Sequence, residues 1–306
     1  MEIIKPAFLS NNIPICFSSD DEYVPLLSVT IQSIMDKSTD TNNYDIVVLM
    51  TEISEENQKT LTELVSPKPN FSIRFVNVGT LVYGYKFFTE ADPTNTKFSE
   101  EIYYRVLVPS LMANYSKVIF CDADLLFLDD IAKLITDYDI SESLVGAVRD
   151  YEGIATCYAK SYERTRYRIN ELQLTNFGDY FNSGLLVMNI KLFNELFTAN
   201  YLLDFAVSKN WQQFDQDVFN YLCKDKVTII DACWNFLEDI EGYFHRLPEK
   251  LFNEYLSSEK SPKVIHFAGR RKPWIYIGSR HNRKFWETAR KTPYYKDLRK
   301  KMDEDN

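Results

Sequence analysis

The sequence predicts an α/β fold in which a mostly parallel sheet is covered by helices on both faces. Short apolar runs alternate along the chain with segments that repeat apolar residues at helical spacing. The order strand, helix, strand, helix, strand over residues 13–78 favours parallel pairing. The length of 306 residues suits one large α/β domain or two modest ones, and 45% apolar residues are enough for a sizeable core.

The elements of the amino-terminal half follow from local patterns. Ile13, Ile15 and Phe17 mark an apolar strand that runs into a polar loop, and the next segment carries apolar residues at helical spacing. Ser54 is expected to cap a further helix, because acidic residues fill the first turn after it. The expected elements are strands over 13–18, 44–50 and 73–78, and helices over 23–35, after Ser54 and over 100–111.

In the carboxyl-terminal half, residues 118–121 and 144–149 are apolar runs that stop at carboxylates. Residues 151–180 differ in kind, because they hold five Tyr and three Arg without a clean period. We expect them to form a long functional insertion, where binding residues tend to gather. The remaining expected elements are strands over 180–189 and 264–267, helices over 191–207 and from 215 to 222, and a basic tail after Gly269.

Charge and cysteine content narrow the class of protein. The net charge of −9, from 35 Lys and Arg against 44 Asp and Glu, disfavours broad nucleic-acid binding, which needs a basic field. Five cysteines without CxxC spacing favour reduced thiols in a cytosolic protein. The amino terminus does not have the pattern of a signal peptide, and no apolar run is long enough for us to expect a membrane span.

Asp122 and Asp124 stand one residue apart at the end of a buried strand, where α/β sheets place their chemistry. Two like charges this close repel unless a cation lies between them, so the pair predicts a divalent metal site. An ordinary strand running into an acidic loop is the alternative. His266 ends another apolar strand, and is either a hydrogen-bonded core histidine or a third ligand. Two carboxylates and an imidazole, completed by phosphate oxygens, suit Mn²⁺, whereas a Mg²⁺ site would rely more on oxygen.

Three other polar segments could take part in chemistry. Asn182 and Gly184 stand at the mouth of an apolar strand, where an amide can bond a hydroxyl and a glycine allows a close approach; an ordinary turn is the alternative. The acids of Asp215-Gln216-Asp217 either cap a helix or bind a sugar and stabilise positive charge on it. Lys272 is either a phosphate ligand or a solvated lysine.

Taken in order, these motifs resemble glycosyltransferase family 8, over most of the chain from about Ile13 to Trp274. The motifs are Ser-Asp-Asp, Tyr-x-Arg, Asp-x-Asp, Phe-Asn-x-Gly, Asp-Gln-Asp and Ile-His-Phe-x-Gly-x-x-Lys-Pro-Trp. The resemblance implies a Rossmann-like α/β/α sandwich of the GT-A type. Residues 1–270 would form the nucleotide-sugar-binding catalytic domain, and residues 271–306 a basic, aromatic, helical tail. The implied activity is retaining transfer of galactose or glucose from a UDP-sugar to a saccharide or glycolipid acceptor, in cell-surface polysaccharide synthesis.

The resemblance also implies roles for single residues. It gives the metal, Mn²⁺ or alternatively Mg²⁺, to Asp122, Asp124 and His266, and it makes Asp150, Gln216 and Asp217 the catalytic candidates. Many relatives carry Asn at the position of Glu22, so this residue departs from the family pattern. The implied donor-binding residues are Ser18, Asp20, Glu22, Arg105, Asp122, Ala123, Asp124, Asn182, Asp215, Gln216, Gly269 and Lys272.

The implied chemistry agrees with general principles. A nucleoside diphosphate leaves poorly until a cation and a group such as Lys272 neutralise its charge. Carboxylates near the sugar then stabilise its oxocarbenium character. Retention can arise through a covalent intermediate on Gln216 or Asp217, or through attack on the face that the phosphate leaves. An amide is a feeble nucleophile, which favours the second route.

The composition of the tail predicts contact with a membrane. Residues after Trp274 mix Lys and Arg with Trp and Tyr, so we expect docking on anionic membrane near a lipid-linked acceptor. The protein would then be cytoplasmic or peripheral on the inner face of the cytoplasmic membrane. A helix that packs on the domain with a solvated basic face is the alternative.

Two other functions are alternatives to the glycosyltransferase. In an aspartyl-nucleophile phosphatase a strand also ends in Asp-x-Asp, but a pair of small residues usually follows it, whereas Leu125 and Leu126 follow here. A binding protein that kept the fold but not turnover is the other alternative.

Overall fold

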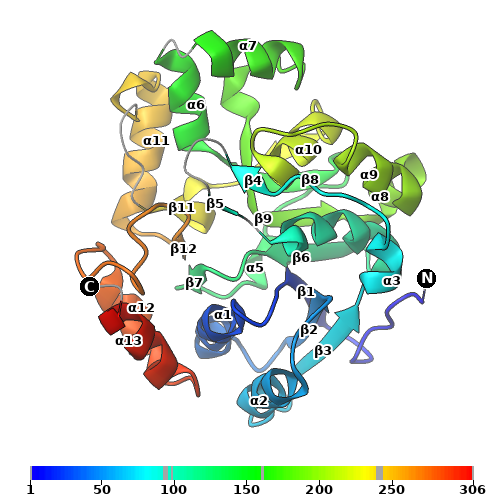
Figure 1. Ribbon diagram of the computed structural model, residues 1–306, viewed down its shortest axis with the longest axis vertical. Coiled ribbons are helices and arrows are strands. Elements are labelled where there is room, and N and C mark those ends of the chain that lie inside the picture. Colours follow the sequence, from blue (N-terminus) through cyan, green and yellow to red (C-terminus); the bar gives the residue numbers. More distant parts are fainter. Residues whose placement is uncertain (1, 92–95, 98, 160–161, 239–243, 305–306) are drawn as a thin grey trace.

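The predicted α/β fold is confirmed by the computed structural model, which describes residues 2–91, 96–97, 99–159, 162–238 and 244–304 (Figure 1). In that part of the chain, seven strands form the main sheet. In chain order they are β1 (Asn12–Ser18), β2 (Asn43–Met50), β3 (Phe71–Asn77), β6 (Lys117–Cys121), β8 (Val145–Arg149), β9 (Phe181–Asn189) and β10 (Val227–Ile229).

The order across the sheet is β10-β8-β9-β6-β1-β2-β3. β1 pairs in parallel with β2 and β6, and β2 with β3 and β8 with β10 are also parallel, whereas β9 runs antiparallel to β6 and β8. The chain moves outward from β1 to β3 and then returns to the other side of β1 at β6. Right-handed crossovers therefore put the helices of the two excursions on opposite faces. The gap between β1 and β6 is a topological switch point, where open α/β sheets bind ligands.

Local sequence explains the helices of both excursions. In the first, α1 (Val24–Lys37) has a proline in its first turn, and the hydroxyl of Ser54 caps α2 (Glu55–Val65) as predicted, accepting from the Asn57 N–H at 3.3 Å. The helix expected over 100–111 is instead a 3₁₀ helix, η1 (Glu100–Leu107), followed by one α-turn, α4 (Val108–Leu111). Pro109 cannot donate to the Arg105 carbonyl, and the Val108 N–H bonds that carbonyl in 3₁₀ fashion.

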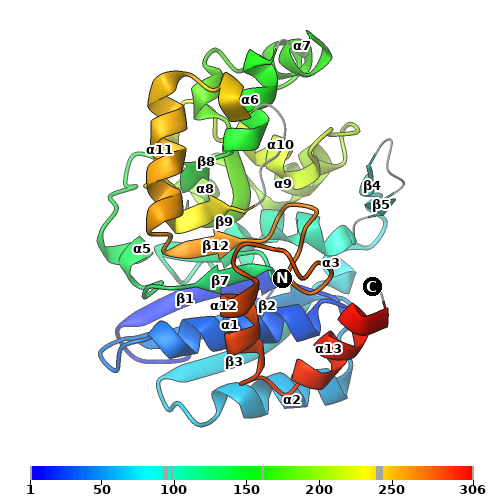
Figure 2. The same ribbon diagram turned by 90° about the vertical axis from the view of Figure 1, so that its left-hand side faces the viewer.

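A second, small sheet joins distant parts of the chain. It consists of β7 (Leu125–Phe127), β11 (Phe236–Leu237) and β12 (Val264–His266). The predicted strand at 264–267 therefore exists, but it pairs with β7 outside the main sheet (Figure 2). The pairing is antiparallel and sets His266 opposite Leu125. Because β7 begins one residue after Asp124, this register brings His266 beside the Asp-x-Asp segment.

Two stretches differ from the predicted elements. The insertion expected over 151–180 is largely helical where it is described, and residues 160–161 lie outside the described residues. Its helices are short, and the second carries mostly charged and polar side chains, so no apolar period marks them. The helix expected over 191–207 is broken at Thr198, whose side chain caps the second half. The elements are α6 (Tyr151–Tyr158), α7 (Tyr162–Asn170), η2 (Phe177–Asp179), α8 (Ile190–Leu196), α9 (Ala199–Ala206) and, close to its predicted bounds, α10 (Phe214–Leu222).

The tail is helical, as predicted, and packs against the start of the chain. α12 (Asn282–Ala289) and α13 (Tyr295–Glu304) both contact α1 (Figure 2). Phe285, Trp286 and Tyr294 are buried in the same apolar cluster as the sheet. These three aromatic residues thus fit the packing alternative, whereas Tyr276 is exposed. The basic residues Arg283, Lys284, Arg290 and Lys296 are also exposed.

All five cysteines are free, and four of them are buried, in agreement with reduced thiols. Among the described residues, no helix combines the length and apolar character that crossing a membrane requires. The other described elements are α3 (Gly79–Val82), β4 (Glu90–Ala91), β5 (Thr96–Lys97), α5 (Lys133–Thr136), η3 (Ala232–Asn235), η4 (Phe244–Arg246) and α11 (Glu249–Lys260).

Candidate active site

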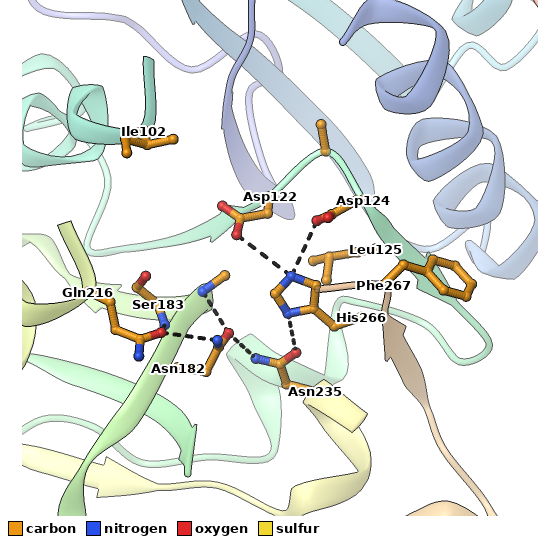
Figure 3. Close-up of polar contacts among 12 residues, drawn as sticks. Ile102, Asp122, Asp124, Leu125, Asn182, Ser183, Gln216, Asn235, His266 and Phe267 are labelled. Carbon is orange, nitrogen blue, oxygen red and sulfur yellow. Dashed lines mark hydrogen bonds and ion pairs between the residues drawn. The ribbon is translucent and has the colours of Figure 1, made fainter. Parts of the chain in front are cut away.

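The predicted site residues gather at the switch point between β1 and β6. β1 ends at Ser18, and β6 ends one residue before Asp122. The hydroxyl oxygen of Thr30, on α1, lies 2.7 Å from the carbonyl oxygen of Ala123 and 2.8 Å from that of Leu125. This contact holds the turn between β6 and β7, so that both carboxylates of the Asp-x-Asp segment face His266 (Figure 3).

Asp122, Asp124 and His266 form a compact three-ligand cluster. His266 Nε2 lies 3.2 Å from Oδ1 of Asp124 and 3.8 Å from Oδ2 of Asp122. One ligand atom from each residue lies within 4.8 Å of the others. The convergence predicted from distant parts of the sequence is therefore present, and two carboxylates with one imidazole are a donor set suited to a divalent transition metal.

Gly184, on β9, leaves the space that this cluster needs. A Cβ at this position would overlap the His266 ring and lie 2.7 Å from Oδ2 of Asp122. The Gly184 carbonyl also accepts the backbone N–H of Asp122 at 2.8 Å, so the strand cannot easily move away. The close approach expected at this glycine is thus made by the candidate ligands themselves.

Arg105 is buried beneath the cluster and neutralises two carboxylates. Its NH2 donates to Oδ1 of Asp122 at 2.8 Å, and its Nε lies 3.1 Å from Oδ2 of Asp215. Its NH1 donates to the Ser183 carbonyl at 2.5 Å, and the guanidinium lies 4.4 Å from the centre of the Phe120 ring. Because the side chain is only 3% exposed, these contacts indicate that Arg105 fixes Asp122 in place.

Lys272 closes the other side of the cluster. Its Nζ donates to Oδ2 of Asp124 and to the Phe267 carbonyl, both at 2.7 Å. Burial alone would raise the pKa of Asp124, but the Lys272 ammonium and His266 outweigh burial and hold that pKa below its ordinary value. The lysine is 22% exposed, so its ammonium remains partly accessible from solvent. Gly269 is half-buried in the loop that carries Lys272.

The Gln216 carboxamide is held by four hydrogen bonds. Its Nε2 donates to Oδ2 of Asp150 at 2.7 Å and to the Tyr180 hydroxyl at 3.0 Å. Its Oε1 accepts from Asn182 Nδ2 at 3.1 Å and from the Ser183 N–H at 3.2 Å. Both protons and both lone pairs are engaged, so this amide is not poised as a nucleophile.

The prediction that Asp217 takes part in catalysis is not supported by its position. Its side chain is fully buried, where Oδ1 accepts from the Tyr180 hydroxyl and Oδ2 from the Tyr167 hydroxyl, both at 2.8 Å. Oδ2 also accepts the Gln213 N–H at 2.7 Å, which caps the start of α10. Of the two readings of these acids, the structural one therefore applies to Asp217.

An acidic groove of about 630 Å³ opens beside β1 and β2. Asp20 and Glu22, which the family resemblance assigns to the nucleoside, line it together with Asp21, Glu52 and Glu101. One carboxylate oxygen of Asp20, Oδ1, accepts the Tyr23 N–H at 3.0 Å, and Glu22 is exposed. The groove is rich in hydrogen-bond acceptors for hydroxyl and N–H groups.

Sequence reasoning missed Asn235, which is 1% exposed and lies 3.0 Å from Nδ1 of His266. It follows Trp234 in the short helix η3 and belongs to no recognisable motif. Only the pairing of β11 with β12 reveals its place, because that pairing sets the end of η3 beside His266.

The buried carboxyl group of Asp215 is expected to make the free energy of unfolding depend on pH. Burial raises its pKa from 3.8 to about 6, with Arg105 opposing the rise. Since folding raises this pKa, the group stabilises the fold most below pH 3.8, and this contribution is lost as pH rises through about 6. We expect Asp215→Asn to remove up to about 3 kcal/mol of this pH dependence. Urea unfolding of both proteins across this pH range measures it, and identical slopes would contradict the assignment.

Comparison with known proteins supports these features. The model of "Glycosyl transferase family 8" matches residues 14–278. General stress protein A of Bacillus subtilis is 27% identical over 266 residues, which are 84% of this chain and 85% of that protein. The lipopolysaccharide 1,2-glucosyltransferase of Escherichia coli is 24% identical over 209 residues, 67% of this chain and 58% of that protein.

Solved structures of glycosyltransferases have the same fold as this chain. The bifunctional glycosyltransferase WbbM superposes with a TM-score of 0.84 at 30% identity, over 98% of this chain but only 53% of that one. The galactosyltransferase LgtC, in complex with donor and acceptor sugar analogues, has a TM-score of 0.70 at 23% identity, over 92% of this chain and 96% of that one, and shows the same GT-A fold. Fold, site and relatives together define a glycosyltransferase.

The chain belongs to glycosyltransferase family 8. The family resemblance stated from the motifs is therefore confirmed, and the phosphatase alternative is set aside.

Proposed function

We propose that this protein is a retaining hexosyltransferase that moves galactose or glucose from a UDP-sugar to a saccharide or glycolipid acceptor, with Mn²⁺ at Asp122, Asp124 and His266. The observation that carries the proposal is the convergence of these three residues at the switch point, with the Lys272 ammonium paired to Asp124. The names of LgtC and of the Escherichia coli relative, a galactosyltransferase and a glucosyltransferase, support a hexose donor and a role in cell-surface polysaccharide synthesis.

The residues present fit a bound cation. The three ligand atoms converge, the missing Cβ of Gly184 leaves room, and one nitrogen among the donors favours Mn²⁺ over Mg²⁺. The cation would supply Lewis-acid neutralisation of the diphosphate leaving group.

Other side chains would bind the donor and stabilise the positive charge that develops on the sugar. The Lys272 ammonium faces the same anion, while Asp20 and Glu22 accept hydrogen bonds from the nucleoside. Asp150 and Asp215 place negative charge where the sugar becomes positive. The Gln216 amide, whose protons and lone pairs are all engaged within the protein, is not a free nucleophile, so we favour attack on the face that the phosphate leaves.

Slow UDP release without acceptor tests this function. With Mn²⁺ present, a panel of UDP-sugars should give release from UDP-galactose or UDP-glucose and little from the others. When a saccharide acceptor is added, the anomeric configuration of the glycoside product, read by NMR, should match that of the donor. No release from any UDP-sugar would contradict the proposal and would favour a binding protein without turnover.

The proposal extends to location. With Phe285, Trp286 and Tyr294 buried, the exposed lysines and arginines of α12 and α13 would contact anionic lipid from the cytoplasmic side. Co-sedimentation with phosphatidylglycerol vesicles tests this contact, and equal sedimentation with neutral phosphatidylcholine vesicles would count against it.

A further inference from the structure

A row of side-chain amides connects Gln216 to His266 (Figure 3). Asn182 Nδ2 lies 3.1 Å from Oε1 of Gln216, and Asn235 Nδ2 lies 2.9 Å from Oδ1 of Asn182. Asn235 Oδ1 then lies 3.0 Å from Nδ1 of His266. All four side chains are buried, and they come from four segments: α10, β9, η3 and β12.

Two backbone N–H groups fix the direction of this row. A backbone N–H can only donate, and those of Ser183 and Gly184 point at Oε1 of Gln216 and Oδ1 of Asn182, at 3.2 and 2.9 Å. Those side-chain atoms must therefore be oxygens, which removes the usual ambiguity of amide orientation. Asn235 must then direct its NH₂ towards Asn182 and its oxygen towards His266.

It follows that His266 carries a proton on Nδ1, because the atom facing it is an acceptor. The other ring nitrogen, Nε2, is the one that faces Asp122 and Asp124. The hydrogen bonds at the Gln216 end of the row also have a fixed direction. Gln216 donates to the Asp150 carboxylate and to the Tyr180 hydroxyl, whose own proton goes to Asp217. Aligned bonds that end on carboxylates strengthen one another.

We propose that Asn235 is a positioning residue for the metal centre. It holds His266 with Nε2 directed at the cation and, through Asn182, ties this histidine to the Gln216 side chain in the sugar site. A ligating histidine whose second ring nitrogen donates a hydrogen bond has a fixed orientation and greater basicity. The effect on the cation rests on the proposed function, whereas the proton on Nδ1 does not.

Metal affinity in the absence of donor provides the first test. Mn²⁺ titration followed by electron paramagnetic resonance should show binding that is about 10–100-fold weaker in Asn235→Leu. Asn235→Asp keeps an oxygen for the Nδ1 proton and should bind Mn²⁺ far more tightly than the leucine variant. Asn189→Ala is the matched control, because Asn189 caps α8 from the end of β9 outside the row, and its affinity should equal that of the wild type.

The ring of His266 provides a second test that needs no metal. In metal-free protein labelled with ¹⁵N-histidine, Nδ1 of His266 should carry a slowly exchanging proton, and Asn235→Leu should make that exchange fast. Equal Mn²⁺ affinity and unchanged exchange in folded Asn235→Leu would overturn the role of Asn235. Absence of Mn²⁺ binding in the wild type would instead contradict the proposed metal site. The exchange measurement would still decide the role of Asn235.

Discussion

Asp124→Asn is expected to remove sugar transfer, with kcat/KM lowered by about a thousandfold or more, equivalent to about 4 kcal/mol of transition-state stabilisation. Asp124 joins two parts of the site, because Oδ1 lies 3.2 Å from His266 Nε2 and Oδ2 accepts from Lys272 at 2.7 Å. The amide loses the negative charge that both a cation and the lysine require. Mn²⁺ binding should be lost together with UDP release.

Asp129→Asn is the matched control for this substitution. Asp129 lies five residues further along the chain, and its carboxylate pairs with Lys133 at 2.7 Å in a partly exposed i,i+4 ion pair. Such pairs contribute little, so activity and Mn²⁺ affinity should stay close to wild type. Circular dichroism must show that Asp124→Asn is folded, because Lys272 loses its carboxylate partner. A folded Asp124→Asn protein that releases UDP at the wild-type rate would contradict the proposed role of the metal.

The sequence predicts those parts of the site that depend on strand ends. Asp122 and Asp150 each follow an apolar run, and parallel strands bring such ends to one edge of a sheet. His266 also ends an apolar run, but periodicity alone could not join it to Asp124. The link came from the family resemblance, and the physical cause is the antiparallel pairing of β12 with β7, a three-residue strand too short to show a pattern.

Other parts could not be predicted because they depend on packing between distant segments. Asp217 and Gln216 are neighbours in one helical turn, yet one is enclosed by Tyr167 and Tyr180 and the other faces Asp150 and Asn182. No local pattern separates them. The buried aromatic residues of the tail present the same difficulty, since basic and aromatic composition is shared by membrane-binding and core-packing helices.

Gly184→Ala should be nearly as damaging as loss of a ligand, although it removes no functional group. The added methyl group would overlap the His266 ring, lie 2.7 Å from Oδ2 of Asp122 and lie 3.0 Å from Oδ1 of Asn182. None of these neighbours is free to turn away, because Arg105 holds Asp122 and Asn235 holds both other side chains. We expect an overpacking cost of about 1–3 kcal/mol. We also expect Mn²⁺ affinity and kcat/KM to fall by about a hundredfold, as when a metal ligand loses its support.

Gly178→Ala separates this effect from the general cost of replacing a glycine. A Cβ there would meet the exposed Asn176 side chain at 3.2 Å, and that side chain can shift into solvent. This control should keep its Mn²⁺ affinity and its rate of UDP release. Titration of both variants with Mn²⁺, alongside thermal unfolding, distinguishes a blocked cluster from a destabilised fold. If Gly184→Ala binds Mn²⁺ as tightly as the control does, Asp122 and His266 do not share one ion, because the methyl group occupies the space between them.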